Sequence, residues 1–241
     1  MQLLLNEVYL RYEDPKEQDA FFAMSSAAVF GALSAGNVDP AALIAALGRA
    51  GEENRLLLWN AAPEEQAILD GTTLQGVLGS SDPAATDFGV FLNDGTSSKM
   101  DYYMEFSADT SWCAAGEAGL TVTLRNAAPA DAASLPWYIT GGGKHGIPPG
   151  QVETVAYVYL PEGAELMSSS ASGTGQSPGF GGGNDAGRQV ISWTTRLAPG
   201  EELTLQVRVR TPQSAQIVTQ MTPTVHAQRT PQLAESCASP E

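Results

Sequence analysis

The sequence predicts an α+β protein, in which a helical N-terminal segment with one embedded strand precedes an antiparallel β-sandwich. The sandwich rests on residues 120–212, where short runs of alternating apolar and polar residues are separated by Pro and Gly. Such alternation is typical of a sheet with one buried and one solvated face. The clearest strand covers residues 203–209, with one apolar side formed by Leu203, Leu205, Val207 and Val209.

Two helices are predicted in the N-terminal segment, and each starts at an Asp-Pro pair. Asp14 can cap a helix that begins at Pro15 and runs to about Ser34. Asp39 and the Pro that follows it repeat this signal for a helix through about Ala50. Apolar side chains at helical spacing are expected to face a core. They are Phe22, Val29, Phe30 and Leu33 in the first helix and Leu43, Ile44 and Leu47 in the second.

The rest of the N-terminal segment is predicted to contain only short elements. Residues 55–59 are apolar and too few for a helix, so they predict the embedded, buried strand. Pro63 opens a third short helix that Gly71 stops. Gly, Ser, Asp and Pro dominate residues 72–85, where we place the domain boundary. We expect residues 1–80 to be a helical lead-in, the end of a larger α/β domain, and residues 86–241 to be the sandwich domain.

Further strands and loops are predicted within the sandwich domain. Asn93-Asp94-Gly95 is a turn signal between strands at residues 87–92 and 98–106, which predicts a long hairpin. Other strands are expected at residues 120–124, 155–160 and 189–194. The Gly-rich segments at residues 141–146 and 168–187 are expected to be loops, and the longer one is expected to be mobile.

Composition excludes several classes of function. The formal net charge of -15 argues against sequence-independent binding to nucleic acid and against docking on an anionic membrane through basic residues. No apolar run reaches the ~20 residues of a spanning helix. The first five residues lack the basic region and the length of a signal peptide. We therefore expect a piece of a longer protein.

Cys113 and Cys237 are the two cysteines, and their separation fits neither a zinc site nor a redox pair. In an exported protein such a pair would form a disulfide that pins the C-terminal tail to the domain. Two unrelated thiols are the alternative.

No catalytic, metal or cofactor site is predicted. The segment Gly141-Gly142-Gly143-Lys144-His145 superficially looks like a phosphate cradle, but it lacks the P-loop spacing and the following helix, so a plain hairpin loop is favoured. The two histidines, His145 and His226, have no carboxylate at ligand spacing. Acidic residues near Asp94 and Asp185 follow no calcium-loop pattern, so turn chemistry is favoured.

The aromatic residues are interpreted first as core and sheet-face residues. The alternative is a carbohydrate-stacking platform formed by an exposed subset of the four tryptophans and of Tyr102, Tyr103, Tyr157 and Tyr159. Residues selected as possible ligand or partner contacts are Arg11, Tyr103, Trp137, Tyr138 and His145.

An ordered set of short motifs resembles one protein family. The set comprises Leu4-Leu5-Asn6-Glu7-Val8-Tyr9, Arg55-Leu56-Leu57-Leu58-Trp59-Asn60, Pro63-Glu64-Glu65-Gln66, Val90-Phe91-Leu92-Asn93-Asp94, Ser98-Lys99-Met100-Asp101-Tyr102-Tyr103, Leu124-Arg125-Asn126-Ala127-Ala128-Pro129, Leu135-Pro136-Trp137-Tyr138-Ile139-Thr140-Gly141, Tyr159-Leu160-Pro161-Glu162-Gly163-Ala164 and Leu197-Ala198-Pro199-Gly200-Glu201. It resembles domain-of-unknown-function family 4012, membrane-anchored envelope proteins of high-GC Gram-positive bacteria. The resemblance implies an extracytoplasmic C-terminal part whose transmembrane anchor lies outside this chain.

Two further resemblances bear on fold and function. A strand ending in Asn126 and Pro129, and the turn at Pro199, are similar to bacterial surface repeats of domain-of-unknown-function family 11, which implies an immunoglobulin-like sandwich. The segment from Tyr9 to Tyr12, followed by acidic residues and a helix, is faintly similar to the LytR-CpsA-Psr ligases. Those ligases grip a polyprenyl pyrophosphate with several arginines, and only Arg11 fits here.

Two function hypotheses follow. The first is a non-catalytic cell-surface module that presents a surface to wall polymer or to another envelope protein. It needs no cofactor and does not bind nucleic acid. The alternative is the accessory C-terminal part of an enzyme that transfers polyprenyl-pyrophosphate-linked polymer.

Overall fold

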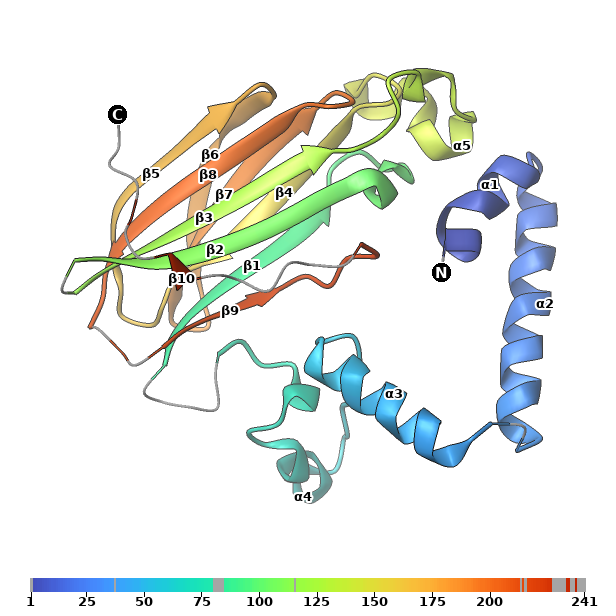
Figure 1. The fold of residues 1–241 in the computed structure, drawn as a ribbon, viewed down its shortest axis with the longest axis horizontal. Helices are drawn as coiled ribbons and strands as arrows, with labels where there is room; N and C mark the ends of the chain where they lie inside the picture. Colours follow the sequence, from blue (N-terminus) through green and yellow to red (C-terminus); the bar gives the residue numbers. More distant parts are fainter. Residues whose placement is uncertain are drawn as a thin grey trace. The chain divides into compact units, whose positions relative to one another are not determined.

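The computed structural model describes residues 2–36, 38–79, 85–114, 116–212, 214, 216–226, 233–234 and 237. The chain divides into two compact units, Met1–Val77 and Leu78–Glu241. Figure 1 shows that the first unit consists of helices and that the second contains the strands.

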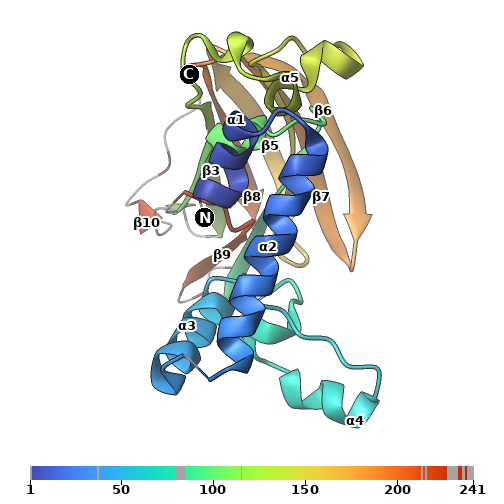
Figure 2. The same cartoon turned by 90° about the vertical axis from the view of Figure 1, so that its right-hand side faces the viewer.

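The first unit contains α1 (Val8–Arg11), α2 (Pro15–Ser34), α3 (Pro40–Glu52) and α4 (Pro63–Gln66), with shorter helical turns at Leu3–Glu7, Ala67–Leu69 and Thr73–Gln75. Figure 2 shows α2, α3 and α4 most clearly. Both Asp-Pro helix starts are confirmed. The side chain of Asp14 accepts a hydrogen bond of 2.9 Å from the backbone N–H of Lys16, and Asp39 accepts one of 3.0 Å from Ala41.

The predicted buried faces of α2 and α3 are wrong at most positions. Val29, Phe30 and Ile44 expose 62%, 73% and 70% of their surface, and Leu33 and Leu47 are also exposed. In α2 apolar residues surround the whole helix, so that no single stripe is selected for burial. Part of this apolar surface forms an open groove of about 330 Å³.

The predicted embedded strand at residues 55–59 is also wrong. This stretch forms neither helix nor strand, and Trp59 is 80% exposed. A strand needs a neighbour that accepts and donates its backbone hydrogen bonds. Here the backbone N–H of Leu58 donates to the carbonyl of Leu74 at 2.9 Å, but no strand is present among the described residues of this unit.

The second unit is built from two five-stranded sheets. Sheet A has the order β6-β7-β4-β1-β9, and sheet B has the order β10-β2-β3-β8-β5. The strands are β1 (Thr86–Asp94), β2 (Met104–Ala114), β3 (Glu117–Asn126), β4 (Val152–Tyr159), β5 (Glu165–Gly173), β6 (Gln176–Asp185), β7 (Arg188–Leu197), β8 (Glu202–Arg210), β9 (Ile217–Met221) and β10 (Leu233–Ala234). The pairs β1–β9 and β2–β10 are parallel and the others antiparallel.

The chain is therefore an α+β protein with a sandwich-like pair of sheets, as the alternating strands predict (Figure 1). The alternation in β8 selects the core face, because Leu203, Leu205, Val207 and Val209 are all buried. From sheet A, the core receives Phe88, Val90, Ala156, Val158, Ile191 and Trp193.

The predicted hairpin at residues 87–106 is wrong, because β1 and β2 belong to different sheets. The side chain of Asp94 accepts hydrogen bonds from the backbone N–H groups of Thr96 and Ser97 and so turns the chain out of sheet A. The hydroxyl of Thr96 then bonds to the backbone of Glu153. A 3₁₀ helix at Met100–Tyr103 leads into β2.

The predicted mobile loop at residues 168–187 is replaced by most of β5 and all of β6. Both strands lie at the ends of their sheets, where β8 and β7 offer open backbone edges. These partners override the low strand propensity of Ser and Gly. Thr174 and Gly175 carry the chain from sheet B to sheet A.

Candidate functional site

The outer face of sheet A carries a groove beside two tyrosines. Tyr157 and Tyr159 alternate along β4 with the buried Ala156 and Val158, so their rings point away from the core. The groove is open and has a volume of about 250 Å³. Its lining includes Tyr157, Tyr159, Gly183, Asn184, Asp185 and Ser192.

Strand register places glycines of β6 in the same rows as this aromatic pair, two strands away across β7. Tyr157 lies opposite Ser192 on β7, and Ser192 lies opposite Gly181 on β6. In the next outward-facing row, Tyr159 lies opposite Val190, which lies opposite Gly183. A Cβ atom at Gly183 would have no heavy atom within 4 Å. The floor of the groove is therefore open at Gly183, whereas at Gly181 the hydroxyl of Ser192 fills the space above the glycine.

The ring of Tyr159 is held from two sides. Its hydroxyl donates a hydrogen bond of 2.8 Å to Oδ2 of Asp185, and the ring of Phe91 meets it edge-on at a centroid distance of 5.6 Å. The hydrogen bond to Asp185, with smaller contributions from desolvation and nearby charge, raises the pKa of the Tyr159 hydroxyl. The hydroxyl stays neutral and oriented, which reduces the entropy that binding a ligand would cost.

The electrostatics of the groove disfavour an anionic ligand, because the carboxylate of Asp185 lines it. No cation lines it. Arg188 is nearby, but its guanidinium binds other groups. It donates hydrogen bonds to the carbonyls of Asp87 and Leu160 and lies 4.0 Å from the Asp87 carboxylate. Aromatic rings beside a carboxylate and an amide provide stacking surface and hydrogen-bond partners for hydroxyl groups. Such an arrangement can bind a sugar.

A second aromatic cluster lies at one end of the strands, where Figure 1 shows α5 (Trp137–Thr140). Trp137 is 57% exposed, and its ring meets that of Tyr138 edge-on at 5.4 Å. Nζ of Lys144 lies 5.5 Å from the centroid of the Trp137 ring. Three of the residues selected from the sequence, Trp137, Tyr138 and His145, thus belong to one short segment.

The other selected residues are placed differently. Tyr103 packs edge-on against Tyr102 at 5.1 Å. Its segment adjoins α5, because the backbone N–H of Lys99 donates to the carbonyl of Ile139. Arg11 lies in the first unit, where its guanidinium forms an exposed ion pair of 2.7 Å with Glu7.

The Gly-rich segment Gly141–Gly146 is not a hairpin loop, which corrects the prediction. It belongs to the connection between β3 and β4, and these strands lie in different sheets. Gly142, Gly143 and His145 have positive φ, so the backbone makes successive tight turns. No helix follows it, and β4 begins at Val152.

Asp101 is the titratable group with the most perturbed environment near this end of the sandwich. Solvent reaches this residue, and neighbouring protein atoms remove part of the water around its carboxyl group. Desolvation, followed by the charge of Asp94, raises the pKa of Asp101 from 3.8 to about 7. Between pH 3.8 and about pH 7, the native state therefore holds a proton that the unfolded state has already released.

We expect Asp101→Asn to stabilise the protein only at neutral and alkaline pH. The raised pKa contributes stability below pH 3.8, and this contribution is lost as the pH rises through about 7. Because solvent reaches the residue, the expected gain above pH 7 is only about 1 kcal/mol. Urea unfolding of both proteins at pH 4 and pH 8 measures it. An equal difference at the two pH values would contradict the assignment.

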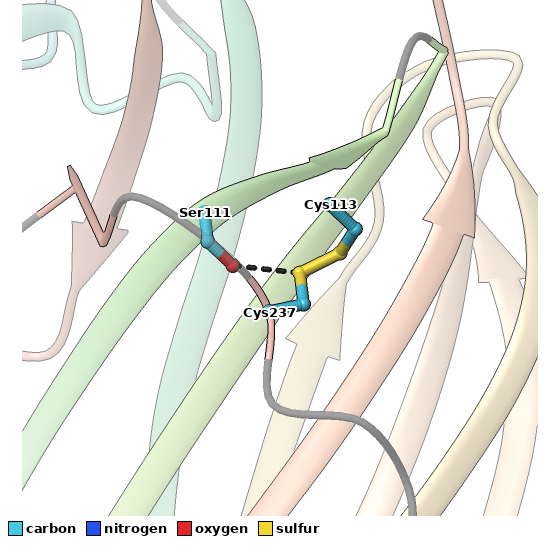
Figure 3. The surroundings of a disulfide bond; sticks show 3 residues. All are labelled: Ser111, Cys113 and Cys237. Atoms are coloured by element: carbon cyan, nitrogen blue, oxygen red, sulfur yellow. Dashed lines mark hydrogen bonds between the residues drawn. A yellow bond between two sulfur atoms is a disulfide. The ribbon is translucent and has the colours of Figure 1, made fainter.

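The disulfide between Cys113 and Cys237 is present, with a Cα–Cα distance of 4.8 Å. Figure 3 shows it beside Ser111, whose hydroxyl donates a hydrogen bond of 2.8 Å to Sγ of Cys237. A Cβ atom at Gly119 would lie 2.6 Å from that sulfur. Glycine at this position therefore lets the disulfide pack directly on the outer face of sheet B.

Within the described part of the chain, no three His, Cys, Asp or Glu side chains gather as metal ligands would. No helix among the described residues is long and apolar enough to cross a membrane. No protein-family model matches the chain, and no curated protein matches its sequence.

Sequence reasoning missed the residues of β6 that complete the groove. Asp185 was interpreted as part of a turn, although its carboxylate accepts the hydrogen bond of Tyr159. The available signal was length, because residues 165–187 can hold two strands of the size seen elsewhere in the domain.

Proposed function

We propose that this chain is a non-catalytic, extracytoplasmic module of a cell-envelope protein that binds wall polymer through the groove of Tyr157 and Tyr159. The observation that carries the proposal is the outward-facing tyrosine pair beside Asp185, with an open glycine floor. These groups supply what a sugar chain needs, namely flat apolar faces and fixed hydrogen-bond partners.

The extracytoplasmic location is supported by the disulfide between Cys113 and Cys237, since such bonds persist in oxidising compartments. The resemblance to domain-of-unknown-function family 4012 supports the same location, with a membrane anchor in the full-length protein. We further propose that the sandwich is immunoglobulin-like, as the surface-repeat resemblance implies.

A polymer is favoured over a protein partner as the ligand of this groove. A stable protein interface usually buries more than ~1,000 Å² in total, whereas this groove is a local depression of about 250 Å³. The ligase alternative receives less support. A pyrophosphate needs several cations, and the Arg11 guanidinium is already paired with Glu7.

The test is binding to insoluble wall material from a high-GC Gram-positive bacterium and to a soluble neutral glucan. We expect saturable binding by the wild type and about tenfold or greater weakening by Tyr157→Ala combined with Tyr159→Ala, because each stacked ring contributes about 1 kcal/mol. Tyr138→Ala is the matched control, because it removes a tyrosine of the second cluster, and its affinity should not change.

Two outcomes would count against the proposal. Wild-type protein that is retained on neither material would remove the basis for polymer binding. Loss of binding in Tyr138→Ala, with binding retained in the Tyr157 and Tyr159 variant, would move the contact to the end of the sandwich. Urea unfolding of each variant checks that the fold is intact.

A further inference from the structure

Sheet A ends at an edge that is unusually open. Among the described residues, β6 pairs only with β7, so its other side presents unpaired backbone N–H and C=O groups. Natural edge strands are usually protected by charged side chains, bulges or Pro. Here no charged residue occurs between Glu165 and Asp185, and Pro178 lies in an irregularity at one end of the strand. Residues 179–183 are therefore an uncharged edge that is free to pair.

We propose that this edge pairs antiparallel with β6 of a second copy of the chain, across a two-fold axis at Gly181. Gly179 then lies opposite Gly183 of the other copy, and Phe180 lies opposite Gly182. A two-fold axis requires a self-complementary surface. Residues 179–183, Gly-Phe-Gly-Gly-Gly, meet this requirement because the single large side chain always faces a glycine.

Phe180 gives this pairing its apolar contact. Its side chain is 46% exposed at the edge of the sheet, directly opposite the buried Trp193 on β7. In the proposed register it covers the bare backbone of Gly182 in the other copy, an arrangement known to stabilise cross-strand pairs that contain glycine. The two Phe180 rings are diagonal neighbours and shield each other from water.

A foreign peptide is a poorer occupant of the same edge. Peptides that add a strand to a sheet gain sequence specificity from side-chain pockets along the edge strand. The glycines of β6 leave no pocket walls at Gly181, Gly182 and Gly183, so only backbone hydrogen bonds would remain. A second copy adds the Phe180 contacts to those hydrogen bonds.

The dimer should be weak and should tighten with salt. Five residues on each side form a contact far smaller than a standard protein interface. Each chain also carries a formal charge of -15, so the two copies repel each other at low ionic strength. Screening reduces this repulsion. A dimer held by ion pairs would respond to salt in the opposite direction.

This pairing would also place two binding grooves on one surface. A two-fold axis normal to the sheet keeps the outer faces of both copies on the same side. The two β4 strands are then five strand spacings apart, which is about 24 Å. This consequence rests on the proposed function, because one polymer chain that contacted both tyrosine pairs would bind with avidity.

The test uses sedimentation equilibrium over a range of protein concentrations, with no polymer present. Gly179 and Gly183 suit substitution, because a Cβ at either position meets no heavy atom within 4 Å and neither has positive φ. Gly179→Lys with Gly183→Lys places like charges opposite each other twice. Gly179→Lys with Gly183→Glu places opposite charges there instead, at the same two sites.

We expect concentration-dependent dimers of the wild type and at least about tenfold weaker dimerisation of the double-lysine variant. The lysine–glutamate variant should dimerise within about threefold of the wild type or more tightly. A wild type that stays monomeric up to about millimolar concentration would overturn the proposal, as would equal dimerisation of the two variants. Because no polymer is present, failure here leaves the polymer-binding proposal intact, and failure of polymer binding leaves this result intact.

Discussion

Cys113→Ser is expected to lower the free energy of unfolding by about 4 kcal/mol. The disulfide joins residues 124 positions apart, and a crosslink that closes so long a loop strongly restricts the unfolded chain. A loss of this size is a large share of the total stability of a typical domain. Urea unfolding of the wild type and the variant measures the difference through the shift of the transition midpoint.

Two controls separate the crosslink from its surroundings. Reductant should lower the midpoint of the wild type nearly to that of Cys113→Ser and should leave the variant unchanged. Ser111→Ala removes only the hydrogen bond to Sγ of Cys237 and should cost less than about 1 kcal/mol. Equal midpoints for the wild type with and without reductant would contradict the stabilising role of the disulfide.

Asn126→Ala is expected to destabilise the protein by about 3 kcal/mol or more. This side chain is fully buried at the end of β3. Its Nδ2 donates to the carbonyls of Gly150 at 3.1 Å and Leu197 at 3.0 Å, and its Oδ1 accepts from the backbone N–H of Ala128 at 3.0 Å. Truncation would remove all three hydrogen bonds from buried backbone groups, and each buried group that loses its partner costs about 1–3 kcal/mol.

Substitution by aspartate separates the donor role of Asn126 from its acceptor role. Asn126→Asp keeps an acceptor for Ala128, but an ionised carboxylate cannot donate to the two carbonyls, so it should be at least as destabilising as alanine. Asn184→Ala is the matched control on the exposed strand β6, and it should change stability by less than about 0.5 kcal/mol. A loss below about 1 kcal/mol for Asn126→Ala would show that the network is not stabilising.

The parts of the fold that local patterns determine were predictable. The alternation in β8 selected its buried face, and Asp14 and Asp39 marked the starts of α2 and α3. Those signals act within a few residues. The order of the strands did not follow from them, because the side chain of Asp94 turns the chain into the other sheet instead of closing a hairpin.

Other errors came from partners distant in sequence. Residues 176–185 have the composition of a loop, yet β7 stabilises them as a strand by supplying an open edge. Residues 55–59 have the composition of a strand, but the described residues of their unit offer no strand for them to pair with. Tyr157 and Tyr159 were among the aromatic residues that the sequence offered for a carbohydrate-stacking platform. Their combination with Asp185 depends on the pairing of β6 and could not be predicted locally.

The central claim is that polymer binds on the outer face of sheet A, and an NMR titration tests it most directly. Isotope-labelled protein would be titrated with neutral oligosaccharides released from the wall. We expect the largest shift changes at Tyr157, Tyr159, Asp185 and their neighbours on β7, with little change at Trp137 and Tyr138. Changes confined to Trp137 and Tyr138, or no changes with material that retains the protein, would contradict the claim.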